Sequence, residues 1–445
     1  MFNTRVLRYG LVVALLVICS LGTLGAISAL DDHSLYDPFS SQELLKDRTF
    51  LRELSPTEER AIQNLELSLV TAGRGDPLYV WFGHSGIVVS DYRIDRSVMY
   101  DYGIFSFDEG FYQTFAMGRL NYQVWATSAP ARYASLIDHN RSITKIKLNL
   151  SDSAKLEVIN FLNFNIKEEN NTYLYHHYRE NCATRIRDII DKGVDGQLKA
   201  WAKSIPSTYT LRQLVDLHTY SAPVESWLLN FLQSGSIDKP ITLWEAMFLP
   251  AVLESALMDF TYINDQGEEV KIASDYTVIN PEVEGLRPQT LTEWRSRSFA
   301  TLLVSLLFAL LMRLLLYLAS KSPLARITYG VINFLVYFGF GLLSLLLIFM
   351  VTISNHDVTY WNENLLFVTP WLLVMAFQAL RYTFSKKYSL KRFRKGNSFF
   401  TFSLVAVIGA KLLFSGFFIQ QNWQVIFTFL PLFVANSTLT CKRQS

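Results

Sequence analysis

A series of apolar runs in the last third of the chain restricts its fold more than any other feature. Each run has about 18 to 25 residues, the length that an α-helix needs to cross the roughly 30 Å hydrocarbon core of a bilayer. A further apolar run lies near the amino terminus, between Arg5 and Asp31. We therefore expect six transmembrane helices, at about 6–29, 299–319, 327–353, 365–383, 398–418 and 423–439.

The positively charged residues alternate with these runs. Lys and Arg follow the second, fourth and sixth runs, whereas the loops at 355–364 and 420–424 carry neither. The positive-inside rule then places both termini in the cytoplasm and exports the segment between the first two spans. The basic stretch at 386–395 lies beside two spans, so we interpret it as a topology signal and expect no nucleic-acid partner. Arg313 and Lys411 fall inside predicted spans, and we expect both to reach towards an interface.

Three parts of the chain follow from this pattern: an anchor at 1–30, an exported domain at 31–297 and a five-helix membrane domain at 298–440. Residues 31–75 have a helical pattern. The segment 77–107 has short β-branched and aromatic runs that are typical of two strands joined by a turn, and 151–170 resembles a helix. The exported domain is therefore predicted to be α+β.

Cys182 is the strongest candidate for a reactive group in the exported part. Asn181 is a favoured N-cap, so Cys182 lies at the first turn of a helix. The partial positive charge of the helix terminus, aided by Arg185, should lower the pKa of the thiol. Because 31–297 contains no second cysteine, the thiol has no partner for a disulfide within that domain.

A nucleophilic cysteine needs a base, and His84 in the strand sequence WFGHSGIVV is the best candidate. Asp101, in a strand that should pair back across the turn, is predicted to orient the imidazole, with Tyr102 and Ser85 as weaker candidates. The sequence HHYRENC offers a zinc site as an alternative, but no further short-spaced His or Cys completes it, so we predict no metal and no cofactor.

Two other segments could serve a lipid substrate. Residues 241–260 are apolar and aromatic, so they fit either a helix on the bilayer surface or a core helix. The polar loop with His356 and Asn364 is expected on the same side as the exported domain, and we expect it to dock against that domain.

Several of these motifs together resemble a known family. The sequences GHSGIVV, YDYGIFSF, FYQTFAMGRLNYQV, YHHYRENCATRIRD, WEAMFLP and NHDVTYWNENLLFVTP are similar to those of the lipoprotein N-terminal intramolecular transacylases, called Lnb. The likeness spans about residues 75–375. The strand histidine followed by Asn-Cys at a helix start also resembles the circularly permuted branch of the papain-like NlpC/P60 superfamily, which includes the lecithin:retinol acyltransferase relatives.

The resemblance implies a multi-pass protein of the bacterial inner membrane with a periplasmic or extracellular catalytic domain. It implies a Cys/His acyltransferase that moves an acyl chain within the lipidated N-terminus of diacylated lipoproteins, with a membrane lipid or the lipoprotein as its partner. A cell-wall amidase or peptidase, which would be a hydrolase, and a non-catalytic membrane scaffold are the alternatives. The predicted catalytic residues are Cys182, His84 and Asp101, and the predicted substrate-binding residues are Ser85, Tyr102, Asn181, Arg185, His356 and Asn364.

Overall fold

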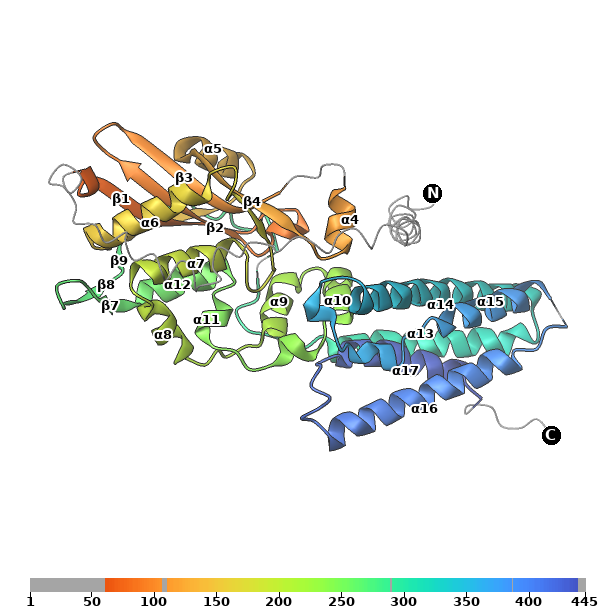
Figure 1. The fold of residues 1–445 in the computed structure, drawn as a ribbon. Helices are drawn as coiled ribbons and strands as arrows, with labels where there is room; N and C mark the ends of the chain where they lie inside the picture. Colours follow the sequence, from red (N-terminus) through yellow and green to blue (C-terminus); the bar gives the residue numbers. More distant parts are fainter. Residues whose placement is uncertain (1–60, 106–109, 289, 386, 439–445) are drawn as a thin grey trace.

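The computed structural model describes residues 61–438, apart from 106–109, 289 and 386. The predicted first span at 6–29 and most of the predicted helical segment 31–75 lie outside these residues. The described chain forms an α+β domain followed by a helical region, and the two lie end to end (Figure 1).

A seven-stranded sheet forms the centre of the α+β domain, and every neighbouring pair in it is antiparallel. The strand order is β6-β4-β3-β2-β1-β5-β9, and a separate hairpin consists of β7 and β8. The strands are β1 Leu65–Ala72, β2 His84–Asp91, β3 Arg96–Ile104, β4 Asn121–Ser128, β5 Ile143–Leu148, β6 Thr172–Leu174, β7 Thr261–Ile263, β8 Glu269–Lys271 and β9 Ala273–Asn280.

The helical prediction for 31–75 is wrong at its carboxyl end. Residues 65–72 form strand β1, which pairs with both β2 and β5 in the interior of the sheet. Leu67 and Leu69 face one core while Val70 and Ala72 face another, so side chains alternate with the period of a strand. The first half of this strand does alternate, with Glu66 and Ser68 between leucines, but the alternation covers only five residues and follows directly on a helical pattern, so the sequence predicts it as the end of that helix.

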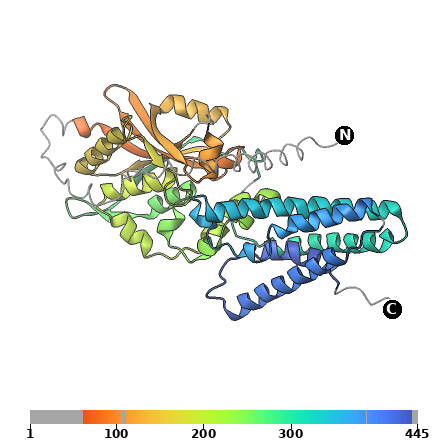
Figure 2. The ribbon, with the colours of Figure 1, turned by 45° about the vertical axis from the view of Figure 1, so that its right-hand side comes forward.

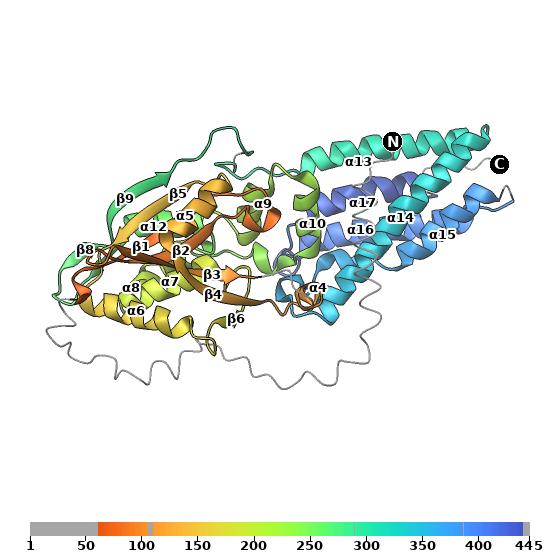
Figure 3. The same ribbon diagram turned by 90° about the horizontal axis from the view of Figure 1, so that it is seen from above.

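Helices cover both faces of this sheet (Figure 3). The larger core lies between the sheet and α6, α7 and α12, while α5 packs on the opposite face against Val88 and Met99. The helices of this part are α4 Phe111–Ala116, α5 Ala129–Asp138, α6 Asp152–Asn165, α7 Cys182–Gly193, α8 Gln197–Lys203, α9 Leu211–Thr219, α10 Pro223–Leu232, α11 Leu243–Ala246 and α12 Pro250–Asp259.

Residues 241–260 form core helices, so their alternative reading as a bilayer-surface segment is wrong. They supply α11 and α12, and Met247, Leu253 and Leu257 are fully buried in the main core. Their apolar character is explained by contact with the sheet and α7.

The helical region contains helices long enough to cross a membrane. It consists of α13 Ser298–Ala319, α14 Pro323–Thr352, α15 Trp371–Phe384, α16 Lys391–Leu413 and α17 Trp423–Asn436. Among the described residues, α13, α14 and α16 have the length and composition of membrane spans. The 22 residues of α13 extend about 33 Å, and Val304, Leu307 and Leu310 on its surface are each more than 60% exposed. Such a continuous exposed apolar face is typical of contact with lipid.

Two predicted spans correspond to shorter helices. The run at 365–383 begins with a 3-10 turn, and α15 starts only at Trp371 because Pro370 precedes it. Helices α15 and α17 have 14 residues each, about 21 Å, which is less than the thickness of the hydrocarbon core. Figure 2 shows the bundle of α13 to α17 extending away from the sheet.

Loops at one end of the bundle dock against the α+β domain, as expected for 356–364. The Asn362 and Asn364 amides donate hydrogen bonds to the Phe231 carbonyl at the end of α10. The Gln420 amide, from the loop before α17, donates to the Gln233 carbonyl. Neither of these loops contains Lys or Arg. The two loops without positive charge therefore lie together beside the α+β domain.

The prediction for Lys411 is wrong. Its side chain is only 3% exposed and pairs with Glu363, and its ammonium also donates to the Gln420 carbonyl at 2.7 Å. Burying an ammonium is costly unless it is paired and hydrogen-bonded, and both conditions hold here. Lys411 thus connects the carboxyl end of α16 to both docking loops, and its ammonium does not reach solvent.

The ion pair of Arg212 and Asp238 provides a test of this packing. Both side chains are almost completely buried, and two guanidinium nitrogens contact the carboxylate at 2.7 and 2.9 Å. Arg212→Ala leaves a buried, unpaired carboxylate and should lower the free energy of unfolding by about 3–5 kcal/mol. Arg179→Ala is the control, because its ion pair with Asp357 is exposed and contributes about 0–1 kcal/mol. The free energy of unfolding of the two variants is measured in mild detergent. An equal loss of this free energy in Arg212→Ala and Arg179→Ala would contradict the prediction.

Candidate active site

Cys182 is the first residue of α7, and Asn181 fixes this helix end. The Asn181 side chain accepts the Thr184 N–H at 2.9 Å, while the Thr184 hydroxyl accepts the Asn181 N–H at 2.8 Å. The Asn181 amide also donates to the carbonyls of His177 and Phe248. Asn181 was predicted to bind substrate. Its polar groups instead form the hydrogen bonds that hold Cys182 at the start of the helix. Cys182 itself remains partly exposed.

His84 and Asp101 meet on neighbouring strands. Gly86 of β2 lies opposite Asp101 of β3, so His84, two residues earlier, points to the same face as the carboxylate. His84 Nε2 donates to Asp101 Oδ1 at 2.6 Å. The side chains are 13% and 1% exposed. The second ring nitrogen of His84, Nδ1, is then the one left for the Cys182 thiol, which lies within hydrogen-bonding distance of the ring.

Arg132 is a residue that sequence reasoning missed. It lies on α5, and its Nε donates to Asp101 Oδ2 at 3.0 Å. The two oxygens of Asp101 are thus divided between His84 and Arg132. Nothing in the local sequence distinguishes this arginine from an ordinary helix-surface residue, because its partner is on a strand that only the tertiary structure brings close.

The charges of this group shift each other's protonation. Burial opposes the imidazolium of His84, but the nearby Cys182 thiolate and Asp101 carboxylate outweigh burial and raise the pKa of His84 to about 9. Burial also opposes the Cys182 thiolate, but the charge and hydrogen bond of His84 lower the pKa of the thiol. The N–H groups of Ser85 and Ala183 donate to the same sulfur and lower this pKa further. Both shifts favour the thiolate–imidazolium form of the pair over the neutral form.

Asp101 remains ionised in this environment. Burial alone would raise the pKa of its carboxyl, but the hydrogen bond and charge of His84 and the charge of Arg132 lower it below its usual value. The predicted role of orienting the imidazole matches this position.

Three buried hydroxyl groups close to Cys182 have no hydrogen-bond partner among the described residues: Ser85, Tyr102 and Tyr173. The Ser85 backbone contacts the sulfur, and the Tyr102 and Tyr173 rings are neighbours, with centroids 6.2 Å apart. Gly103, at φ +84°, packs closely here, because a Cβ at this position would be in van der Waals contact, 3.8 Å from Cys182 Cβ and from the Tyr173 hydroxyl. Ser85 therefore contacts the thiol through its backbone, whereas Tyr102 contacts the Tyr173 ring, and the substrate-binding role of both residues stays a prediction.

The other predicted substrate-binding residues have partners elsewhere. Arg185 is buried, pairs with Glu180 at 2.8 Å and lies over the Tyr173 ring. His356 is hydrogen-bonded to the Phe115 carbonyl of α4. Asn364 is fully buried and donates to α10. These contacts make them packing and docking residues, and none of them is with His84, Asp101 or Cys182.

The histidines beside Cys182 are also engaged. His176 Nε2 donates to Asp357 Oδ1 at 2.9 Å, and the Arg179 guanidinium pairs with the same carboxylate. His177 is enclosed by the rings of Phe82, Tyr178 and Phe248. Within the described part of the chain, no group of three or more His, Cys, Asp or Glu side chains could hold a metal ion.

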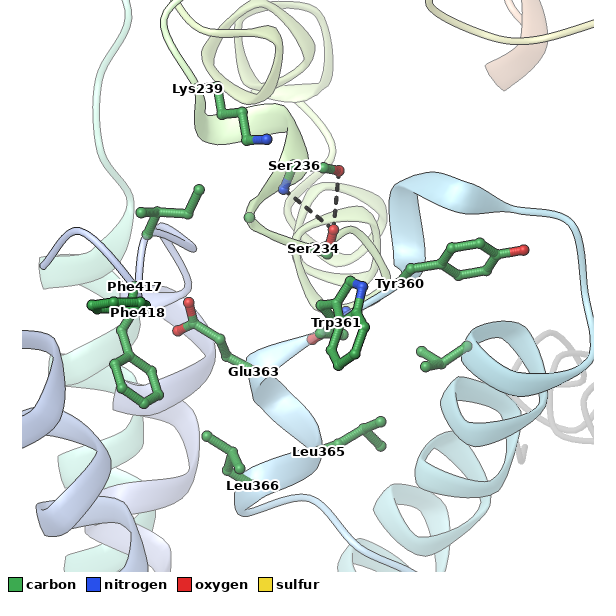
Figure 4. Close-up of a pocket in the computed structure, with 14 residues that line it drawn as sticks. Ser234, Ser236, Lys239, Tyr360, Trp361, Glu363, Leu365, Leu366, Phe417 and Phe418 are labelled. Atoms are coloured by element: carbon green, nitrogen blue, oxygen red, sulfur yellow. Dashed lines mark hydrogen bonds between the residues drawn. The ribbon is translucent and has the colours of Figure 1, made fainter. Parts of the chain in front are cut away.

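A separate pocket of about 730 Å³ lies where the bundle meets the α+β domain (Figure 4). Trp361, Glu363 and Phe417 are among the residues that line it. Neither Cys182 nor His84 lines it. Several of its polar groups are already paired, since the Ser234 hydroxyl bonds with Ser236 and the Glu363 carboxylate pairs with Lys411. We therefore place the candidate chemistry at Cys182 and not in this pocket.

The family model described as Lnb N-terminal periplasmic domain matches residues 53–216. This segment belongs to the Lnb family. The match confirms the resemblance to Lnb, and it contains Cys182, His84, Asp101 and Arg132. It ends before α10, so the helical region lies outside the matched segment. The likeness to the NlpC/P60 enzymes stays a prediction. Neither a curated protein nor a solved structure matches the chain.

Alkylation of Cys182 tests the ion pair. In the wild-type protein the thiol should react with iodoacetamide at lower pH than an ordinary thiol does, because His84 keeps its proton up to about pH 9 and lowers the pKa of Cys182. His84→Ala removes the positive charge and should move the midpoint of the alkylation rate to higher pH. Mass spectrometry of the labelled peptide measures the rate at each pH.

Arg132→Gln should shift the alkylation midpoint in the same direction by less. Arg132 holds Asp101 Oδ2 at 3.0 Å, so its loss frees the carboxylate to turn away from His84 and weakens the interaction that stabilises the imidazolium. Arg93→Gln is the matched control, since Arg93 is exposed and pairs with Asp91 at the turn between β2 and β3. A midpoint that stays unchanged in His84→Ala would refute the ion pair.

Proposed function

We propose that this protein is a membrane-bound thiol acyltransferase that modifies bacterial lipoproteins. In this proposal it moves an acyl chain within the lipidated N-terminus through a thioester on Cys182. The observation that carries the proposal is the connected group of Cys182, His84, Asp101 and Arg132 in an Lnb domain that is joined to candidate membrane spans.

In the first half-reaction, the Cys182 thiolate attacks the carbonyl carbon of an ester on the glyceryl group. A bond from Sγ to this carbon forms, and the bond from the carbon to the glyceryl oxygen breaks. The imidazolium of His84 gives its proton to the departing oxygen. The products are a Cys182 thioester, a free glyceryl hydroxyl and a neutral His84.

In the second half-reaction, the N-terminal amine of the same lipoprotein attacks the thioester carbonyl. The neutral His84 accepts the amine proton, an amide bond forms, and the carbon–sulfur bond breaks to restore the thiolate. The enzyme returns to its starting protonation state, and the total mass of the lipoprotein is unchanged.

Backbone and hydroxyl groups are available for the oxyanion of both steps. The N–H of Cys182 belongs to the first turn of α7, where N–H groups lack an intrahelical acceptor and the helix dipole favours negative charge. The Tyr173 hydroxyl is a further candidate, because it is buried beside Gly103 and no described residue forms a hydrogen bond with it. Such donors stabilise a developing oxyanion when they are fixed in advance.

The orientation in the membrane is also part of the proposal. We place six spans in the chain, with the α+β domain on the periplasmic or extracellular side of the inner membrane. The support is that the two loops lacking Lys and Arg contact this domain, whereas Lys321 lies in the connection between α13 and α14 and Lys387 in that between α15 and α16.

A diacylated lipoprotein incubated in detergent with the protein tests the reaction. Wild type should yield an N-acylated product of unchanged total mass, while Cys182→Ala and His84→Ala should give none. Intact-mass and N-terminal tandem mass spectrometry detect this product. In the Arg93→Gln control the product should form at the wild-type rate.

An unaltered lipoprotein from all variants would overturn the proposed reaction. A loss of one acyl chain without its reappearance on the amine would instead show a hydrolase. Release of peptides from cell-wall material by wild type but not Cys182→Ala would favour the amidase.

A further inference from the structure

A row of aromatic rings begins beside Cys182. Gly103 packs against both Cys182 and Tyr175, since a Cβ at its position would lie 3.8 Å from Cys182 Cβ and from the Tyr175 ring. The Tyr175 ring stacks on Tyr122 with centroids 4.3 Å apart, and Tyr122 stacks on Phe105 at 4.8 Å. The rings come from three separate chain segments: the residues after β6, strand β4 and the end of β3.

The row continues through α4 to the helical region. Phe105 stacks on Phe111 of α4 at 5.6 Å, and Phe111 lies 6.0 Å from Phe115. Phe115 meets the ring of His356 edge-on at 5.8 Å, in the loop that follows α14. We define the aromatic row as Tyr175, Tyr122, Phe105, Phe111 and Phe115.

Four of the five rings of the row are partly exposed, whereas Tyr122 is buried in the main core. Cys182, Tyr175, Phe105 and Phe111 are only partly buried, and they pack on the outside of the main core. Phe115 is 48% exposed. The exposed parts of the row therefore lie at its two ends, at Tyr175 beside the thiol and at Phe105, Phe111 and Phe115 towards α4.

Helix α4 is attached to the end of a candidate span. The Asn355 N–H donates to the Met117 carbonyl at 2.8 Å, and Gly118 packs directly on the backbone of Asn355 and His356. A Cβ at Gly118 would lie 2.8 Å from that backbone, so only glycine permits the contact. Since α14 ends at Thr352, α4 lies at the level where this span leaves the apolar layer (Figure 1).

Several of the exposed residues at this level are aromatic. Tyr112 of α4 is 64% exposed, and in the neighbouring loops of the bundle Trp361 is 94% and Phe417 is 87% exposed. Aromatic side chains gather at the boundary between hydrocarbon and water in membrane proteins. One end of the aromatic row is therefore at the membrane surface and the other is at the nucleophile.

We propose that the aromatic row binds one acyl chain of a membrane-anchored lipid substrate and places its ester carbonyl at Cys182. The proposal deepens the acyltransferase function and rests on it. An apolar row without charged members fits methylene groups, each of which gains free energy when it leaves water. The chain leaves the bilayer at Phe115, lies along Phe111 and Phe105, and ends at Tyr175.

A photoreactive lipid tests binding without catalysis. Full-length Cys182→Ala protein in nanodiscs is exposed to a phosphatidylcholine whose sn-2 chain ends in a diazirine, and labelled peptides are identified by mass spectrometry. Labels are expected on residues 110–123 as well as on α13, which serves as the internal reference. The double variant Phe111→Ser with Phe115→Ser should lower the ratio of label on 110–123 to label on α13 about tenfold.

Tyr92→Ser is the matched control, because Tyr92 is a 63% exposed aromatic residue in the turn between β2 and β3. Its label ratio should equal that of wild type. Label on α13 but none on 110–123 would overturn the proposal. Crosslinks from 110–123 to a co-purified polypeptide in place of lipid would also overturn it.

Ester chain length gives a second readout. The ratio of the rates on a sixteen-carbon and a four-carbon p-nitrophenyl ester should fall about tenfold in the Phe111→Ser, Phe115→Ser variant and stay unchanged in Tyr92→Ser. An unchanged ratio in the double variant would refute the assigned role of the row. If wild type cleaves no ester through Cys182 while lipid still labels 110–123, the acyltransferase function fails and lipid binding by the row stands.

Discussion

The contact between the first residue of α7 and the first residue of β2 is the interaction on which the site depends. A partly buried thiolate at Cys182 needs a positive neighbour, and His84 provides it only while Asp101 stabilises the imidazolium. Asp101 is itself 1% exposed, so its charge requires the hydrogen bond from Arg132. Because α5 and α7 pack on opposite faces of the sheet, this series of charges passes from one layer of the domain to the other. The sheet register between β2 and β3 therefore sets the protonation state of the nucleophile.

A second constraint is the polar junction between domain and bundle. Asn362 and Asn364 satisfy a carbonyl at the end of α10, and Asn422 donates to the Asn364 side chain at 2.7 Å. Buried amides without partners would cost free energy, so these hydrogen bonds favour one relative position of the two parts. The Trp227 indole on α10 also donates to Thr428 within α17 at 2.9 Å. These hydrogen bonds therefore fix the position of the α+β domain, which contains α7, relative to the ends of the candidate spans.

The sequence predicted those parts of the site whose signals are local. An N-cap before Cys182, a strand histidine at His84 and a carboxylate on the paired strand were all readable from a few neighbouring residues, and the structure brings them together. Arg132 was missed because a helix arginine carries no mark of a partner on another layer. Strand β1 was mistaken for a helix because its short alternation of leucines with Glu66 and Ser68 follows directly on a longer helical pattern. Lys411 was misplaced because its partner, Glu363, comes from a loop whose docking position depends on the tertiary structure.

In the proposed reaction, burial around Cys182 also bears on the choice between transfer and hydrolysis. A thioester can react with water or with an amine, and an enzyme favours the amine by limiting water at the carbonyl. The thiol lies on the edge of the main core, and Gly103, Tyr173 and Tyr175 pack close to it, so only part of Cys182 stays open to a substrate. An acyl chain lying beside the thiol would cover the open side of Cys182 with methylene groups. The acyl chain itself would then exclude water from its own thioester, and the tethered amine of the same lipoprotein would be the nucleophile with access to the carbonyl.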